Sequence, residues 1–386
     1  MAKKKRQPAN ESKSAPRSWA TSGLTAVVAV ALVAALAVQL RVVSSAVETG
    51  VASDRIVLEN GFEDRLVGSV KLAKSDFGPK SPWRYFSEDG VEVRRLAKAP
   101  HRVVRVPRKR GIHFMWPAPH VGYVRSVPTK TGKPIRMEVI STEPRVFALE
   151  GFLTGDEADH LISFAQDDAN PYKLAPSTTG TESWTQGGRA STSSTRTSEN
   201  AFDVTSQVSR NLKHRAFDLL RIATFNDTWS DGIQILKYEV GQAYVGHHDY
   251  FPVGQSVGKG THNFDATAGG SNRYATLFLY LSDVEEGGHT VFPRAQNVSD
   301  DIAHGTVPAE AAKLFEEGGW ENSMITTECY SKLHVKPARA KAILFYSQHP
   351  DGRLDDRSFH GACPVVRGQK WAANLWVWNE CRYSMC

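Results

Sequence analysis

His247 and Asp249 form a His-x-Asp pair inside the segment YVGHHDYF. Alternate residues of a β-strand share a face, so these two side chains are expected to lie together while His248 points away. One imidazole and one carboxylate supply two of the three ligands in the facial triad of non-haem Fe(II) oxygenases. We therefore predict an iron site and choose His360, in the segment SFHGACPV, as its third ligand.

Each part of this triad is a weak signal alone, because most histidines in proteins are structural or exposed. His289, in the segment GGHTVFP, is the nearest competitor for the third position. A structural membrane protein with incidental His and Asp residues is the least favoured alternative.

Lys370 follows His360 in the strand-like run KWAANLWVWN. A lysine within an apolar strand is unfavourable unless it is paired. A dicarboxylic cosubstrate would supply the partner, with its distal carboxylate at the ammonium and its keto-acid end at the metal. The alternative is that Lys370 faces solvent, as most lysines do, and periodicity does not decide between the two.

The elements that must position these residues are strands. From residue 231 onward, short aliphatic and aromatic runs are separated by Gly, Pro and Asp. Thr154 and Glu157 form a capping box that predicts an earlier helix, and a second helix is expected over 204–224. Helices followed by several short strands predict an α+β domain built on a sandwich or barrel. Long insertions at 252–272 and 295–328 are expected to be functional loops.

The N-terminal segment predicts a membrane anchor. Residues 18–40 carry no charge, and at about 1.5 Å per residue they can span a hydrocarbon core of about 30 Å. The apolar run is longer than the usual signal-peptide core, although a cleaved signal peptide is the alternative. The basic tail 1–17 would stay in the cytosol, and the remaining chain would be lumenal, which makes this a single-pass type II protein.

The net charge of +6 lies mostly in that tail, which holds six basic residues and one acidic residue. The rest of the chain is nearly neutral, which argues against a nucleic-acid partner. Residues 41–140 carry no recognisable chemical motif, and we expect either a stem or a small β-rich module there. The domain organisation expected is a tail (1–17), an anchor (18–40), this segment (41–140), a catalytic domain (141–380) and a C-terminal Cys-containing tail (381–386).

From about residue 144 to 378 the chain resembles the prolyl 4-hydroxylase catalytic-domain family, particularly its membrane-anchored plant and algal type. The resemblance is carried, in order and spacing, by PRVFALEGFLTGDEADHLI, TRTS, LKYEVGQAYVGHHDYF, RYATLFLYLSDVEEGGHTVFP, KAILFYSQHPDGRLDDRSFHGACPV and GQKWAANLW. It implies a double-stranded β-helix, or jelly roll.

The resemblance also implies residue roles. His247, Asp249 and His360 fall on the Fe(II) ligands, and Lys370 falls on the residue that binds the distal carboxylate of 2-oxoglutarate. Asp231 stands where relatives often carry Glu. Further contacts are implied to 2-oxoglutarate for Tyr238, Thr290 and Trp376, and to the peptide for Tyr244, Arg273 and Arg196; we expect Trp371 to line the approach to the iron as well.

The expected activity is peptidyl-proline 4-hydroxylation with O2 and 2-oxoglutarate, releasing succinate and CO2, with L-ascorbate restoring iron that has become oxidised. The expected partner is a proline-rich or collagen-like polypeptide, met at the membrane of the endoplasmic reticulum or, as the alternative, the Golgi. A dioxygenase acting on lysyl residues or a small molecule, and a non-catalytic peptide-binding protein, are the alternatives.

Four cysteines lie near the C-terminus, and in a lumenal domain they permit two disulfides. We expect Cys329–Cys363, which would steady the segment that follows His360, and Cys381–Cys386. Four cysteines allow three pairings, and free buried thiols are the further alternative.

Overall fold

The computed structural model describes residues 53–60, 62–130, 133–177, 196–255, 262–296, 306–317 and 328–382. Within these ranges, no helix is both long enough and apolar enough to cross a membrane. The membrane span predicted at 18–40 lies outside the described residues.

A small β-rich unit occupies the described part of 53–116. Its five strands follow the order β2-β1-β5-β3-β4, and only the β1–β5 pair is parallel. Val57, Tyr85, Leu96 and Val103 are among the residues that form its own core. Of the two alternatives for this part of the chain, the structure has the β-rich module. The strands are β1 (Ser53–Glu59), β2 (Phe62–Leu72), β3 (Trp83–Phe86), β4 (Glu92–Val93) and β5 (Arg102–Pro107).

The larger unit is built on a nine-stranded antiparallel sheet with the order β6-β7-β8-β17-β13-β20-β11-β10-β9. Its first strand and most of its second lie before residue 141. The short strands predicted from residue 231 onward are confirmed. The strands of this sheet are β6 (Val124–Val127), β7 (Ile135–Ser141), β8 (Val146–Glu150), β9 (Ala175–Pro176), β10 (Glu199–Asp203), β11 (Ile233–Tyr238), β13 (Arg273–Tyr280), β17 (Lys341–Tyr346) and β20 (Lys370–Trp378).

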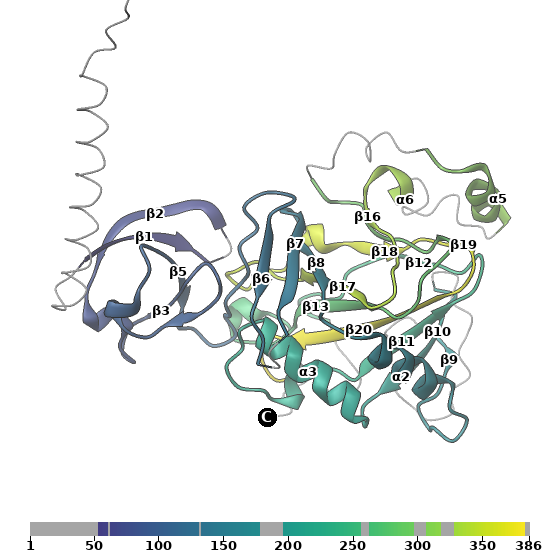
Figure 1. Cartoon of the computed structure of the whole chain (residues 1–386), viewed down its shortest axis with the longest axis horizontal. Coiled ribbons are helices and arrows are strands. Elements are labelled where there is room, and N and C mark those ends of the chain that lie inside the picture. The colour runs from purple at the N-terminus through teal and green to yellow at the C-terminus, as the bar shows by residue number, and fades with distance from the viewer. Residues whose placement is uncertain are drawn as a thin grey trace, which may run out of the picture.

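A second, four-stranded sheet with the order β12-β18-β15-β16 packs on one face of the large sheet. Apolar side chains from both sheets, such as Tyr238, Phe278, Phe292 and Phe345, share one core between them. Figure 1 shows this smaller sheet on one side of the large sheet and the helices α2 and α3 on the other. Its strands are β12 (Tyr244–His247), β15 (Thr290–Phe292), β16 (Leu333–Val335) and β18 (His360–Ala362), and β14 (Glu286–Gly287) pairs separately with β19 (Val365–Arg367).

Helix α2 (Gly155–Gln166) begins at the predicted capping box, with Thr154 Oγ1 accepting from Glu157 N at 3.2 Å and Glu157 Oε2 accepting from Thr154 N at 2.8 Å. Helix α3 (Gln207–Leu219) is shorter than predicted. Ser206 caps its N-terminus, and Arg221 has a φ of 56°, which ends the helical path. A short helix, α5 (Ala309–Glu317), lies within the insertion at 295–328, and another, α6 (Glu328–Ser331), begins at its end; much of the insertion is outside the described residues.

Trp116 ties the N-terminal unit to the large sheet and its helices. Its side chain has no solvent exposure, and its Nε1 donates to the carbonyl oxygen of Leu219 at 2.8 Å. The guanidinium groups of Arg125 and Arg221 lie 5.2 and 5.1 Å from its ring. The two β-rich units are therefore joined by a packed contact, which Figure 1 shows as the N-terminal unit lying beside β6 and β7.

Replacing Trp116 with Ala is expected to lower the free energy of unfolding by about 3–5 kcal/mol, because the truncation leaves a large cavity and an unpaired carbonyl. Chemical denaturation measures the change. Val121→Ala is the control, since Val121 is exposed and should change stability by less than about 0.5 kcal/mol. A loss below 1 kcal/mol for Trp116→Ala would contradict this packing.

Candidate metal centre and cosubstrate pocket

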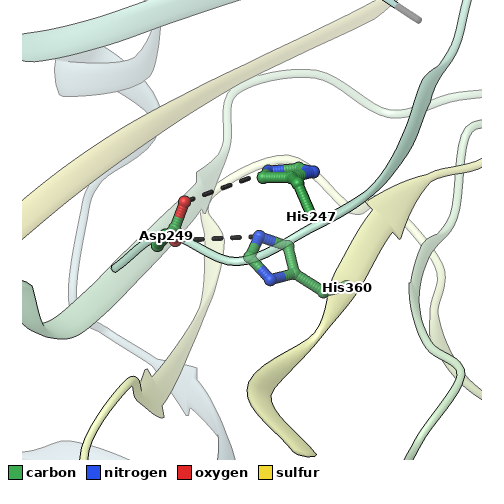
Figure 2. A group of neighbouring side chains, drawn as sticks. All are labelled: His247, Asp249 and His360. Carbon is green, nitrogen blue, oxygen red and sulfur yellow. Dashed lines mark ion pairs between the residues drawn. The ribbon is translucent and has the colours of Figure 1, made fainter. Parts of the chain in front are cut away.

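The three predicted ligands converge at one point. Strands β12 and β18 are antiparallel with His247 opposite His360. Asp249 lies two residues beyond the end of β12, so the bend after the strand, and not strand alternation, brings its carboxylate to the histidines. His247 Nε2 lies 3.9 Å from Asp249 Oδ1, and His360 Nε2 lies 3.7 Å from Asp249 Oδ2. Figure 2 shows the two imidazoles facing the carboxylate. One ligand atom from each residue lies within 4.8 Å of the other two, and no other cluster of three such residues occurs among the described residues.

Backbone carbonyls orient both imidazoles. The Nδ1 of His247 lies 3.0 Å from the oxygen of Val245, and the Nδ1 of His360 lies 2.9 Å from the oxygen of Ser358. A carbonyl oxygen can only accept, so each Nδ1 carries the proton and each Nε2 has a free lone pair. This is the arrangement that metal-binding histidines require, and the residues therefore fit an iron ion.

The protonation states also suit a metal. Burial lowers the pKa of His247 to about 3, which keeps its imidazole neutral. Burial alone would raise the pKa of Asp249, but His360, His247 and Arg273 together lower it, so the carboxylate is ionised. Thr276 Oγ1 donates to Asp249 Oδ2 at 2.6 Å and holds the carboxylate in place. Metal ligands bind in these deprotonated forms.

The neighbouring histidines lie elsewhere. His248 points to the opposite side of the chain, where its ring stacks on Tyr250 with centroids 4.4 Å apart. Its Nε2 lies 3.1 Å from the carbonyl oxygen of Asp356. The ring of His289 lies 4.9 Å from that of His334, and His289 belongs to no ligand cluster. His360, and not His289, is therefore the third ligand of the triad.

Lys370 lies on the inner face of β20, opposite Tyr238 of β11. Its side chain has no solvent exposure, and its Nζ has no hydrogen-bond partner among the described residues. Burial lowers the pKa of this ammonium to about 7. The alternative that Lys370 faces solvent is wrong. An unpaired buried ammonium fits the distal carboxylate of 2-oxoglutarate, which would supply the missing charge.

Two of the three other residues expected beside the cosubstrate line the same interior. The ring of Tyr238 lies 5.2 Å from Lys370 Nζ, and Thr290 Oγ1 accepts from Tyr280 Oη at 3.0 Å. The backbone just before Thr290 reaches the lysine, because a Cβ placed on Gly288 would lie 3.3 Å from Lys370 Cδ. Tyr238 and Thr290 are therefore available to a ligand that pairs with Lys370.

Three residues expected to contact the peptide flank the triad, together with Trp376, which the resemblance assigns to the cosubstrate but which here contacts Arg273. Tyr244 stacks on His247 with centroids 3.8 Å apart, and the Arg196 guanidinium lies 4.6 Å from the Tyr244 ring. On another side, the Arg273 guanidinium lies 3.6 Å from the Trp376 ring and donates to the backbone oxygen of Asp249 at 3.2 Å. The structure brings all four side chains to the metal site.

Asp231 and Thr276 complete this arrangement. Asp231 Oδ2 accepts from Arg273 Nε at 2.9 Å and from Trp378 Nε1 at 3.1 Å. The Asp side chain, which is shorter than the Glu that relatives often carry at this position, therefore anchors Arg273. The contact of Thr276 with the ligand Asp249 was not foreseen, and its only signal is a polar residue on the inner face of the apolar run RYATLFLY.

Trp371 does not join the site. It lies on the face of β20 opposite Lys370, within the core that α2 and α3 cover. Its Nε1 donates to Gln369 Oε1 at 2.6 Å. The expectation that Trp371 lines the approach to the iron conflicts with strand alternation, because adjacent residues of a strand point to opposite faces.

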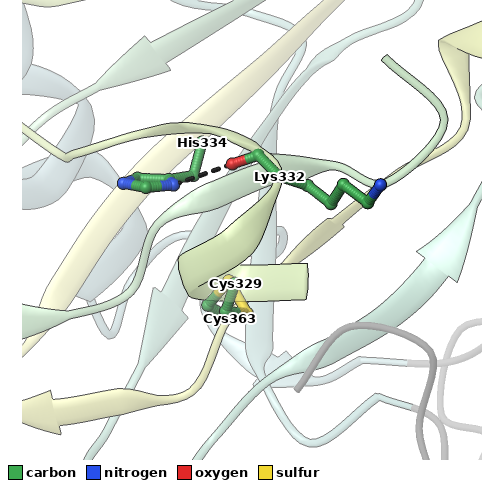
Figure 3. The surroundings of a disulfide bond; sticks show 4 residues. All are labelled: Cys329, Lys332, His334 and Cys363. Carbon is green, nitrogen blue, oxygen red and sulfur yellow. Dashed lines mark hydrogen bonds between the residues drawn. A yellow bond between two sulfur atoms is a disulfide. The ribbon is translucent and has the colours of Figure 1, made fainter. Parts of the chain in front are cut away.

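A disulfide joins Cys329 of α6 to Cys363, just after β18, as expected. Figure 3 shows the bond beneath α6. It closes a span of 34 residues and fixes the segment that follows the ligand His360. Cys381 is also disulfide-bonded. Cys386, its expected partner, lies outside the described residues.

Comparison with known proteins agrees with this site. Residues 233–378 match the model of the 2OG-Fe(II) oxygenase superfamily. The probable prolyl 4-hydroxylase 8 of Arabidopsis thaliana is 38% identical over 245 residues, which are 62% of this chain and 70% of the relative. The probable prolyl 4-hydroxylase 3 of the same plant is 36% identical, over 62% of this chain and 71% of the relative. A solved viral collagen prolyl hydroxylase from Paramecium bursaria Chlorella virus-1 is 21% identical and covers 60% of this chain and 95% of its own, with a TM-score of 0.38.

The site and the sequence match define an Fe(II)- and 2-oxoglutarate-dependent dioxygenase. With both groups bound, enzymes of this class use O2 to couple decarboxylation of 2-oxoglutarate to hydroxylation of a substrate. Within that class, the chain belongs to the prolyl 4-hydroxylase family.

Replacing His247, Asp249 or His360 with Ala is expected to abolish retention of one equivalent of Fe(II) or Mn(II), because a triad has no spare protein ligand. Metal analysis after gel filtration measures retention. His248→Ala is the matched control, since its side chain points away from the triad, and it should keep full occupancy. Retained metal in any one ligand variant would remove that residue from the triad.

Lys370→Met should weaken binding of 2-oxoglutarate at least a hundredfold, because losing one partner of a buried ion pair costs about 3–5 kcal/mol. The wild-type affinity should also fall by about tenfold per pH unit above pH 7. The buried ammonium loses its proton as the pH rises through its pKa of about 7, and the dicarboxylate then binds only with proton uptake. Calorimetry with Mn(II) measures both effects, and a wild-type affinity independent of pH from 7 to 9 would contradict them.

Proposed function

We propose that the protein hydroxylates prolyl residues at C4 in extended, proline-rich or collagen-like polypeptides, with O2 and 2-oxoglutarate as cosubstrates and succinate and CO2 as products. One observation carries the proposal: a chain of the prolyl 4-hydroxylase family holds a three-ligand cluster beside an unpaired buried ammonium. The first fits Fe(II), and the second fits the distal carboxylate of 2-oxoglutarate. We further propose that the two facing sheets form the jelly roll typical of such enzymes.

The surroundings of the triad suit a polyproline chain. Tyr244 and Trp376 present aromatic rings, and the guanidinium groups of Arg196 and Arg273 lie against those rings. Aromatic-lined grooves bind polyproline II segments well, because such segments are already extended and lose little entropy on binding. Planar guanidinium groups can donate to the peptide carbonyls, which have no internal partners in that conformation.

The compartment proposed is the lumen of the endoplasmic reticulum or the Golgi, with residues 18–40 as the anchor and L-ascorbate as the reductant for iron. The disulfide between Cys329 and Cys363 supports an oxidising compartment, because cytosolic thiols are kept reduced. The charge-free length of 18–40 supports the anchor.

A proline-rich decapeptide is expected to gain 16 Da on proline and to release one succinate per hydroxylation, whereas free proline should be a poor substrate. Mass spectrometry and a succinate assay with Fe(II), 2-oxoglutarate and ascorbate measure the two products. The Asp249→Ala variant controls for non-enzymatic oxidation. Equal turnover of free proline or free lysine, or a mass gain on a residue other than proline, would overturn this substrate.

A further inference from the structure

The side chain of Asn272 holds three separate segments together at the start of β13. Its Oδ1 accepts from the backbone nitrogens of Phe251 and Arg273, each at 2.9 Å. Its Nδ2 donates to the carbonyl oxygens of Phe251 at 2.8 Å and Phe264 at 3.0 Å. The residue is fully buried. This amide therefore bonds four backbone groups at once, and such saturated networks are rigid.

These segments carry the metal ligand and the peptide side of the site. Phe251 follows Asp249 by two residues, and Arg273 donates to the backbone oxygen of Asp249. Phe264 belongs to the 252–272 insertion, and its ring stacks on that of Phe251 with centroids 4.8 Å apart. Asn272 thus holds the chain that follows Asp249 and joins it to Phe264 of the insertion.

The same point is connected to the N-terminal unit. The backbone nitrogen of Asn272 donates to Asn379 Oδ1 at 2.7 Å, and the backbone nitrogen of Asn379 donates to the carbonyl oxygen of Asn272 at 3.1 Å. His113 Nε2 donates to the carbonyl oxygen of Asn379 at 2.7 Å. Asn60, which follows β1, donates in turn to the carbonyl oxygen of His113 at 2.8 Å. A continuous set of hydrogen bonds runs from the N-terminal unit to Asn272.

A second contact reaches the insertion directly. Lys109 Nζ donates to the carbonyl oxygen of Thr267 at 3.1 Å, and the backbone nitrogen of Gly111 donates to Glu380 Oε1 at 3.0 Å. The segment 109–113 therefore lies against both the insertion and the end of β20. The family match begins only at residue 233, so this support comes from a part of the chain outside it.

We propose that Asn272 is a positioning residue through which the N-terminal unit holds Asp249 and Arg273 in place for peptide binding. The part of this proposal that concerns peptide binding rests on the proposed function, whereas the part that concerns the rigidity of the chain around Asp249 and Arg273 does not. Sites need such support because small displacements of a reacting group lower the rate steeply. The N-terminal unit then helps to position the active-site residues and is not a spacer.

The test is Asn272→Asp, which keeps the shape but removes both donated hydrogen bonds and places a carboxylate oxygen against two carbonyls. We expect hydrogen exchange over 249–255 and 262–273 to rise at least tenfold, peptide KM to rise at least fivefold, and succinate released per hydroxyproline to rise at least twofold. Binding of Mn(II) and 2-oxoglutarate should stay within twofold. Asn170→Asp is the control, because its amide also donates to a backbone carbonyl, at 2.8 Å to Phe164, but lies in a partly exposed turn on the α2 side of the molecule.

His113→Leu separates the N-terminal connection from the local one and serves if Asn272→Asp does not fold. It removes the bond to Asn379 and the ring contacts with Trp229 and Tyr274 but leaves the amide of Asn272 in place. It should raise exchange over 249–255 and 262–273, and peptide KM, in the same direction by a smaller factor. Unchanged exchange over 249–255 and 262–273 in both variants, or a loss of 2-oxoglutarate binding equal to the loss of peptide binding, would overturn the proposal. If the wild-type protein fails to hydroxylate proline, the proposed function fails, while the exchange measurement still decides the role of Asn272.

Discussion

The antiparallel register of β12 and β18 is the constraint on which the active site depends. It sets His247 opposite His360, and the residues that follow β12 turn the carboxylate of Asp249 back between them. A shift of the β12–β18 pairing by one residue would leave the two imidazoles on opposite faces of the sheet. The large sheet, the disulfide at Cys363 and the hydrogen bond from Thr276 all act to preserve this one register.

The cosubstrate pocket depends on the burial of a lysine ammonium, which is energetically unfavourable and which the fold maintains. Lys370 lies among Tyr238, Phe278 and other apolar neighbours with its ammonium unpaired. Such a group destabilises the folded protein until an anion binds, and stability is often lower at functional sites for this reason. The same burial gives specificity, because only a ligand with a carboxylate at that depth relieves it.

The two β-rich units share their cores and hydrogen bonds more closely than a stem and a catalytic domain would. Trp116 fills the large core, whereas His113 and Lys109 contact the strand ends and the insertion beside the site. The sequence around these residues does not reveal either contact, because a buried tryptophan and an exposed one look alike in a sequence. These contacts of the described part of 53–116 could therefore only emerge from the structure.

Local patterns in the sequence determined the ligand types, the short strands from residue 231 onward, and the start of α2 at Thr154, because spacing and capping act between near neighbours. The apolar setting of Lys370 suggested a dicarboxylic cosubstrate, and the family resemblance added the role of Tyr238. Only the tertiary structure decided that Lys370 points toward the site and Trp371 toward the core that α2 and α3 cover. A strand buried on both faces has apolar residues at every position, so its sequence shows no alternation of polar and apolar residues. It also decided that Asn272 holds the Asp249 segment, because that contact joins residues that meet only when the sheets have packed.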